Sequence, residues 1–419
     1  MPDKRKDSKG RILKEGERQR SDGRYEYRYT DAGGSVRSIY SWRLVETDPT
    51  PSGKRKSKPL RELETTILID LNDGIDGYSA NTTTLNEAYE DFFATKVKLK
   101  ESSRIHYQSV YNHHARDVIG IKPVGDIKPS HIRKLYIDMQ VKDGLKFSTV
   151  KGLNMLLHQI FEMLVDDDIL RKNPTKGLLR DLDINQSAKR HALSRAEQDR
   201  FLTFIASDTC AQRWIPLITF LFGTGARIGE ATAITWEDID FDQKEIHIRK
   251  AHTTALTEYG TTCRKLGPTK TIASARTIPM FQDVYRILKA EYNIQFLQAG
   301  RHSIQSNFVF KSRCGNPVNV TSFWLALRSM CDRCNAAEEK LAAQESRSPI
   351  VVPYFSPHII RHTFCTRMCE EEPNLKVVQE IMGHANFQIT MDVYNEATKD
   401  AKRLSFESLE GKFKVTAGL

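Results

Sequence analysis

The apolar residues of this chain repeat with two different spacings, one typical of strands and one typical of helices, and the helical spacing is the more common. Residues 24–29 alternate with a period of two, which is typical of a β-strand, and a second alternating run follows the turn-forming Gly33 and Gly34. A further alternation covers residues 245–250. Most other patterned segments place apolar residues at helical spacing. The patterning predicts a mainly α-helical protein with small β elements.

Changes in this pattern predict three domains in the 419-residue chain. Residues 1–75 should form a three-stranded sheet covered by a helix, which the apolar spacing of residues 59–71 indicates. Residues 76–184 should form an all-helical domain of about four helices. Residues 185–419 should form a mainly helical α+β domain with one β interruption.

Capping signals mark the first long helices of the second and third domains. In the second domain this helix should follow a linker, residues 76–81, and begin after Thr84, three residues before Glu87. In the third domain it should begin after Ser194, three residues before Glu197. A Ser or Thr followed at this spacing by Glu is a capping box, so a helix is expected after each.

Composition indicates what kind of partner the protein binds and in which cellular compartment it acts. The formal net charge of +10 and a pI near 9.1 favour a polyanionic partner. No stretch approaches the roughly 20 apolar residues that span a bilayer, so we expect a cytoplasmic protein that does not enter a membrane. The 7 cysteines are scattered, as expected for reduced thiols. Cys331 and Cys334 lack a second pair at ligand spacing, so no metal site is expected.

A glycine-rich turn between two expected helices carries the first candidate site residue. Gly223 and Gly225 should end one helix, and Arg227 follows at the turn. Glu230 comes one helical turn later, where its carboxylate can brace the guanidinium. Taken alone, such a turn is more often simple helix punctuation than a site.

A lysine is expected at the turn of a β-hairpin further along the chain. Lys270 precedes strand-like sequence that ends at Ile278 and Pro279. A hairpin of this kind can deliver one ammonium group to a reaction centre. Lys265 lies on the same expected hairpin and is the alternative.

A further candidate pair lies at an expected helix start. Ser356 and Pro357 are typical of the cap and first position of a helix. His358 and Arg361 then share one face near the amino end, where backbone amides favour an anion. A single pair of this kind is usually a solvated or capping pair.

The last candidates are a histidine and a tyrosine near the C-terminus. Gly383 should stop a helix over residues 375–382, and His384 follows it. Tyr394 lies further on and is the candidate nucleophile. Alone, a glycine-histidine pair is usually only a helix stop, and a tyrosine is usually a packed aromatic.

Taken together, these side chains suit chemistry at a phosphodiester. Cleavage increases the negative charge on the phosphoryl oxygens in the transition state, and two guanidiniums can hold those oxygens bidentately. A tyrosine hydroxyl can attack the phosphorus, so neither a metal ion nor a cofactor is expected. The order and spacing of the motifs within one domain favour this chemistry over the simpler interpretations.

This set of residues resembles the tyrosine recombinase, or phage integrase, family. Six positions carry the resemblance: Arg227, Lys270, His358, Arg361, His384 and Tyr394. Lys270 is preferred to Lys265 because it stands directly before the family's Thr-x-x-Ser-x-Arg-x-Ile-Pro pattern. Residues 9–14, 22–25 and 40–42 are similar to the N-terminal part of conjugative-transposon integrases. The resemblance therefore implies arm-binding, core-binding and catalytic domains along the whole chain.

The resemblance implies the reaction and its main groups. Tyr394 would attack the scissile phosphate, form a 3′-phosphotyrosyl bond and free a 5′-hydroxyl, which conserves bond energy. Arg227 and Arg361 would hold the non-bridging oxygens. An enzyme of this kind would integrate and excise a mobile element such as a conjugative transposon.

The resemblance also implies the roles of the remaining groups. Lys270 would protonate the departing 5′ oxygen, and His358 would assist proton transfer at the tyrosine. His384 would hydrogen-bond the phosphate, and Glu230 would support the site.

The first domain is expected to contact DNA. Arg24 and Arg28 lie on one strand face, and Tyr40 and Trp42 share a face of the next strand. A two-stranded ribbon can enter a major groove, and Lys54 falls in a loop suited to phosphates. The alternative is a solvated charged face over an aromatic core.

Partners and rival functions follow from the same resemblance. The expected partners are double-stranded attachment sites, three further copies of the chain in a homotetramer on DNA, and a directionality factor (an excisionase). The C-terminal segment, residues 399–419, is expected to pack partly against a neighbouring protomer. The rivals are a relaxing topoisomerase, a non-catalytic DNA-binding protein and a metal-dependent nuclease.

Overall fold

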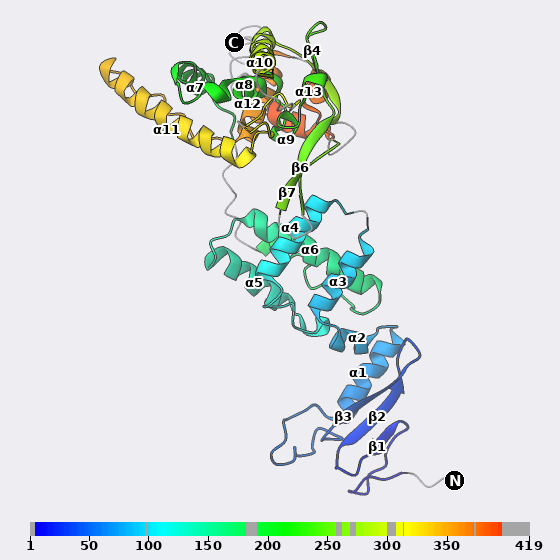
Figure 1. Cartoon of the computed structure of the whole chain (residues 1–419). Coiled ribbons are helices and arrows are strands. Elements are labelled where there is room, and N and C mark those ends of the chain that lie inside the picture. Colours follow the sequence, from blue (N-terminus) through cyan, green and yellow to red (C-terminus); the bar gives the residue numbers. More distant parts are fainter. Residues whose placement is uncertain are drawn as a thin grey trace, which may run out of the picture. The chain divides into compact units, whose positions relative to one another are not determined.

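The computed structural model describes residues 5–97, 99–181, 191–256, 262–268, 274–299, 307–312, 314–372 and 374–395. The chain divides into two compact units, residues 1–188 and 189–419 (Figure 1). Helices predominate in both units and all the described sheets are small, so the predicted fold class is confirmed. The three-domain boundaries remain a prediction.

The first unit begins with an antiparallel three-stranded sheet, in the order β1 (Glu17–Gln19), β2 (Tyr25–Thr30), β3 (Val36–Ser41). Helix α1 (Leu60–Asn72) packs against it. Tyr25 and Tyr27 are buried on the helix side with Leu60, as the alternation predicted. The opposite face of β2 carries Glu26 and Arg28.

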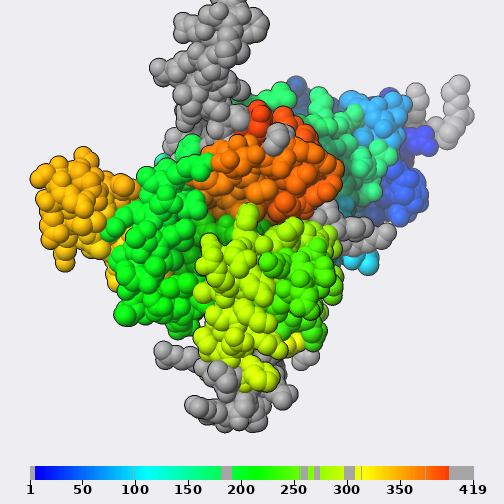
Figure 2. Space-filling view, turned by 90° about the horizontal axis from the view of Figure 1, so that it is seen from above, coloured from blue at the N-terminus to red at the C-terminus, as the bar shows by residue number. Residues whose placement is uncertain are grey.

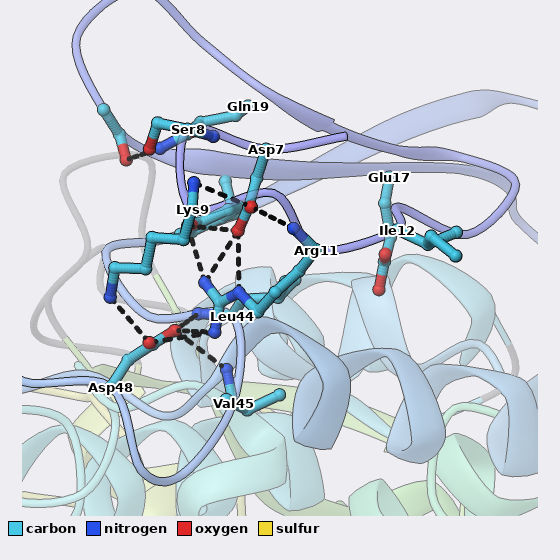
Figure 3. A network of polar contacts seen from close by, with 12 residues as sticks. Asp7, Ser8, Lys9, Arg11, Ile12, Glu17, Gln19, Leu44, Val45 and Asp48 are labelled. Carbon is cyan, nitrogen blue, oxygen red and sulfur yellow. Dashed lines mark hydrogen bonds and ion pairs between the residues drawn. The ribbon is translucent and has the colours of Figure 1, made fainter. Parts of the chain in front are cut away.

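A polar network fixes the turn that follows this sheet (Figure 3). The buried Asp48 carboxylate accepts hydrogen bonds from Lys9 Nζ at 2.9 Å and Arg11 Nη1 at 2.9 Å. It also accepts from the backbone amides of Leu44 at 2.9 Å and Val45 at 3.3 Å. The network therefore ties the N-terminal segment to the start of the loop that carries the expected DNA-binding lysine.

A helical bundle forms the rest of the first unit, around a core separate from that of the sheet. Its elements are α2 (Gly77–Thr82), α3 (Leu85–Thr95), α4 (Glu101–His114), η1 (Val124–Asp126), α5 (Pro129–Val141), α6 (Phe147–Asp166) and η2 (Leu178–Asp181). Helix α6 packs against α3, α4 and α5 and supplies much of the buried core. The Thr84 capping box forms as predicted.

The expected linker at residues 76–81 is instead helical over most of its length. Helix α2 occupies Gly77–Thr82, and the Asp76 carboxylate accepts a hydrogen bond from the Ser79 amide at 3.1 Å. Its polar composition pointed to a linker, but the side-chain cap is enough to start a short helix. Ala80 anchors this helix in the unit.

The second unit is mainly helical. Its helices are α7 (Arg195–Ser207), η3 (Gln212–Trp214), α8 (Ile215–Thr224), α9 (Ile228–Ala231), η4 (Trp236–Asp238), α10 (Gln282–Ala299), α11 (Val320–Gln344), α12 (Pro357–Glu371) and α13 (Leu375–Met382), and residues 387–395 are also helical. Helix α8 is buried against α10 and α12. Helix α11 extends away from the body of the unit (Figures 1 and 2).

The β interruption predicted for this unit is present as two small sheets. One has the order β4 (Ile239–Asp240), β5 (Glu245–Ile248), β8 (Arg276–Pro279), and the other is the hairpin of β6 (Lys250–Leu256) and β7 (Thr262–Pro268). Helix α9 packs against β6. Over the described residues, no helix is long and apolar enough to cross a membrane.

The Asp48 network gives a first prediction. Asp48→Ala removes the shared acceptor of four donors, so we expect the sheet of the first unit to lose about 2–3 kcal/mol of stability. The measurement is amide hydrogen exchange of β1–β3 in the full-length chain. Asp22→Ala is the control, because the exposed Asp22 carboxylate accepts hydrogen bonds from the amide and the guanidinium of nearby Arg24, and its loss should leave the exchange of β1–β3 close to that of the native chain. Equal exchange in the two variants would contradict the role of Asp48.

Candidate active site

Arg227 lies where α8 passes into α9. Helix α8 ends at Thr224 and is capped by Gly225, whose φ of 60° is left-handed, and a Cβ there would meet Phe364 Cδ1 at 2.4 Å. Arg227 Nη1 donates to Glu230 Oε1 at 2.7 Å, and the Arg227 amide donates to Glu230 Oε2 at 2.9 Å. The structure thus brings Glu230 onto Arg227, as the spacing predicted.

Arg361 reaches the same place from α12. Its side chain is buried, and Nη1 donates to the Gly225 carbonyl at 2.8 Å while Nη2 donates to the Met382 carbonyl. Burial lowers the pKa of Arg361 to about 9, and the nearby Arg227 cation acts in the same direction. His358, one turn earlier in α12, is exposed.

His384 follows the end of α13, where Gly383 has a left-handed φ of 62°. His384 is 8% exposed, and its Nδ1 lies 3.0 Å from Thr390 Oγ1. Gln379 Nε2 donates to the His384 carbonyl at 2.9 Å. Burial lowers the pKa of His384 to about 4, and Arg361 and other guanidiniums add to this shift. The imidazole is therefore neutral at pH 7.

Tyr394 lies in the helical stretch of residues 387–395 and is partly buried. It packs against the cluster that joins α12 and α13, which includes Phe364, Val378 and Met382. Tyr394 therefore packs against α12 and α13. Arg361 lies near the start of α12, and His384 follows the end of α13.

The position of the expected lysine is only partly described. Lys270 lies in residues 269–273, outside the described residues, between β7 and β8. The alternative, Lys265, is exposed on β7 opposite Thr253. The expected hairpin differs from the structure, because β7 pairs with β6 and β8 pairs with β5. Because Lys270 is outside the described residues, the choice between the two lysines stays a prediction.

Three polar residues belong to this site that sequence reasoning did not single out. Arg276 of β8 donates from Nη2 to Glu230 Oε2 at 2.9 Å, so Glu230 bridges Arg227 and Arg276. Gln379 and Thr390 both contact His384. Strand alternation places Arg276 on the same face of β8 as the buried Ile278, but no local signal names its partners.

This arrangement is suited to an anion with several oxygens. Arg227, Arg276 and Arg361 converge, and the buried Glu230 carboxylate lies among them. Arg227 remains 35% exposed at its side chain, so donors stay open to a ligand. In the part of the chain that is described, no group of three His, Cys, Asp or Glu side chains is arranged to hold a metal ion.

A second cationic surface lies on the outer face of the first sheet. The Arg24 guanidinium lies over Tyr40 at 5.4 Å and over Trp42 at 5.8 Å, and Lys54 Nζ lies 5.1 Å from the Trp42 ring centre. We call these four residues the aromatic-cation patch. Arg28 is exposed on the same strand face as Glu26, whose carboxylate accepts from Tyr40 at 3.3 Å.

Family profiles match three parts of the chain. The profile described as "Phage integrase family" matches residues 191–401, and "Phage integrase, N-terminal SAM-like domain" matches residues 84–139. The profile described as "DNA binding domain of tn916 integrase" matches residues 1–71.

Two relatives match this chain over nearly its whole length. "Transposase from transposon Tn1545" of Streptococcus pneumoniae is 30% identical over 416 residues, which cover 98% of this chain and 97% of that relative. "Transposase from transposon Tn916" of Enterococcus faecalis has the same identity and coverage.

Solved structures agree with the sequence relatives. The Tn1549 transposon integrase in complex with transposon right end DNA is 26% identical, with a TM-score of 0.65, over 78% of this chain and 100% of that chain. The lambda integrase tetramer bound to a Holliday junction is 17% identical with a TM-score of 0.51, over 93% of this chain, and shares the fold.

The fold, the convergent arginines and these likenesses define an enzyme class, the tyrosine-type site-specific DNA recombinases. The chain belongs to the phage integrase family. It is a DNA-binding enzyme that cleaves and rejoins DNA, so the resemblance drawn from the sequence is confirmed.

The buried imidazole gives a prediction for pH dependence. Because the pKa of His384 is lowered to about 4, the unfolded chain takes up a proton near pH 6.5 that the folded chain does not. Stability from this group is full above pH 6.5 and is lost as the pH falls toward 4. Between pH 7 and pH 5 the loss should be about 2 kcal/mol.

Urea unfolding at the two pH values, followed by tryptophan fluorescence, measures this loss. His384→Asn should show a smaller decrease than the native chain, whereas His247→Asn, at a partly exposed position of β5, should behave as the native chain does. An unchanged decrease in His384→Asn would show that other groups cause it.

Proposed function

We propose that this recombinase integrates and excises a mobile element such as a conjugative transposon. The observation that carries the proposal is the convergence of Arg227 and Arg361 from different helices on one turn, beside the His384 imidazole. The match over nearly the whole chain to transposases named for Tn1545 and Tn916 supports a transposon end as the DNA substrate. The Tn1549 integrase was solved with such an end.

In the proposed reaction, the Tyr394 hydroxyl attacks the scissile phosphorus. The bond from phosphorus to the 5′ oxygen breaks, and the DNA 3′ end becomes a phosphotyrosyl ester. The 5′-hydroxyl of a partner strand reverses the reaction and frees the tyrosine. Because one phosphodiester is exchanged for another, the cycle needs no nucleotide cofactor.

The basic side chains take separate tasks in this proposal. Arg227 and Arg361 hold the non-bridging oxygens, and Glu230 supports Arg227. The His384 imidazole hydrogen-bonds the phosphate, for which a neutral ring is competent. His358 assists removal of the tyrosine proton, and Lys270 protonates the departing 5′ oxygen.

The aromatic-cation patch is the proposed DNA surface of the first domain. Rings beneath Arg24 and Lys54 restrict these cations at the surface, and Arg24 Nε also donates to Asp22 Oδ2 at 2.8 Å. Arg28 extends the same face of the sheet. The match of residues 1–71 to an integrase DNA-binding profile supports this use.

We further propose a homotetramer on two DNA duplexes. Exchange of two duplexes breaks four phosphodiesters, and each chain offers one Tyr394, so four protomers are needed. A directionality factor would select excision over integration, and the reaction would take place in the cytoplasm. Residues 399–419, which lie outside the described residues, are proposed to contact a neighbouring protomer.

Replacement of the nucleophile tests the function. A nicked duplex that carries the element's end and releases a short 5′-hydroxyl strand should trap a covalent adduct with the native chain in EDTA. Tyr394→Phe should form none, because it lacks the attacking oxygen; a denaturing gel reads the result. Adduct formation by Tyr394→Phe would mean that another residue attacks.

Two further outcomes of this assay separate the rivals. DNA binding without any adduct would favour a non-catalytic protein, and loss of cleavage in EDTA would favour a metal nuclease. A native adduct that rejoins only its own strand, with no exchange between two duplexes, would favour a relaxing topoisomerase.

The proton that the departing 5′ oxygen takes up gives a test of the role of Lys270. Lys270→Ala should slow cleavage about 100-fold, within the usual range for a general acid. A duplex with sulfur in place of the 5′ bridging oxygen should restore most of the rate, because a thiolate leaves without a proton. Lys265→Ala is the matched variant on β7 and should show neither effect. Rescue of Lys265→Ala alone would assign the proton to Lys265.

A further inference from the structure

Three different arginines cap three successive carbonyls at the end of α13. Arg276 Nε donates to the Ile381 carbonyl at 2.6 Å, Arg361 Nη2 to the Met382 carbonyl, and Arg227 Nη2 to the Gly383 carbonyl at 3.2 Å. The last carbonyls of a helix have no partner within it and carry partial negative charge. The end of α13 is therefore the shared anchor of the guanidinium cluster.

Arg276 differs from the other two in how its donors are used. Nη1 donates to the Ser274 carbonyl at 2.9 Å and Nη2 to Glu230 Oε2 at 2.9 Å, while Nε holds Ile381. Its side chain is only 5% exposed, against 35% for Arg227. Each of its nitrogens thus contacts the protein, so Arg276 is placed to hold other groups and not to bind substrate.

We propose that Arg276 is a positioning residue for phosphate activation. Its bond to Glu230 sets the orientation of the Arg227 guanidinium. Its bond to the Ile381 carbonyl holds β8 against the end of α13. The end of α13 in turn positions Arg361 and the turn that carries His384. This inference rests on the proposed function. Arg276 would contact no substrate, yet its loss should lower the rate of bond breaking.

The geometry requires a guanidinium at this position. Its planar fork reaches a carboxylate and two carbonyls in three directions, which a single lysine ammonium cannot do. Arg276→Lys keeps the charge beside Glu230 but loses part of the bracing. Single-turnover cleavage of the nicked duplex should fall about 10- to 100-fold, with DNA affinity within about threefold of the native value.

A matched variant controls for damage to the fold. Arg200→Lys also replaces a largely covered arginine, whose side chain is 16% exposed and which pairs with Glu338 at 2.7 Å between α7 and α11. Arg200 belongs to neither the proposed catalytic set nor the α13 anchor. Its lysine variant should cleave at the native rate even where thermal unfolding shows a similar loss of stability.

A substrate change separates positioning from general damage. Replacing one non-bridging oxygen of the scissile phosphate by methyl removes the negative charge that Arg227 is proposed to hold. On the methylphosphonate isomer that replaces the oxygen held by Arg227, the deficit of Arg276→Lys should shrink to about threefold or less. An equal deficit on both substrates would assign Arg276 a purely structural role and overturn the inference.

A second measurement tests the route through Glu230. If Arg276 acts through this carboxylate, Arg276→Lys and Glu230→Gln together should slow cleavage far less than the product of their single effects. Multiplicative effects would overturn the inference, as would a native rate in Arg276→Lys. Failure of the native chain to form a Tyr394-dependent adduct would instead refute the proposed function.

Discussion

The Glu230 carboxylate is the interaction on which the site depends. It is 3% exposed and accepts from Arg227 on one oxygen and from Arg276 on the other. Burial alone would raise the pKa of Glu230, but Arg276 and then Arg227 outweigh burial and lower it, so the group stays charged. A shared buried carboxylate offsets the repulsion between two guanidiniums and fixes the direction of each. Arg361 is held in the same region by the Met382 carbonyl at the end of α13.

The remaining positive charge has consequences for the groups around it. Both Arg361 and His384 have a lowered pKa, first because of burial and then because of neighbouring guanidiniums. A phosphodiester that enters the site brings negative charge, which counteracts this repulsion for both groups. The protein thus holds its cations in place before the substrate arrives, at some cost to its own stability. Electrostatic preorganisation of this kind stabilises charge that develops in the transition state without further rearrangement.

Sequence patterns predicted what is encoded within a few neighbouring residues. The Thr84 and Ser194 capping boxes and the left-handed glycines at the ends of α8 and α13 are of this type. The segment after Asp76 shows the limit of such patterns. Its composition indicated a linker, but the Asp76 side chain caps a short helix there. Family resemblance placed Arg227 and Arg361 in one site, where the structure brings them onto one turn. The role of Arg276 escaped prediction because its acceptor, the Ile381 carbonyl, is 105 residues away and leaves no local pattern.

The two cationic surfaces of this recombinase use arginine in opposite ways. In the aromatic-cation patch, Arg24 lies at the surface over the rings of Tyr40 and Trp42, where salt screens its attraction to phosphates and counterion release governs binding. At the α13 anchor, Arg276 and Arg361 are buried, and screening by salt is weak. Ionic strength therefore acts mainly on how often a DNA site is occupied. The rate of bond breaking within the bound complex depends instead on the fixed geometry around Glu230.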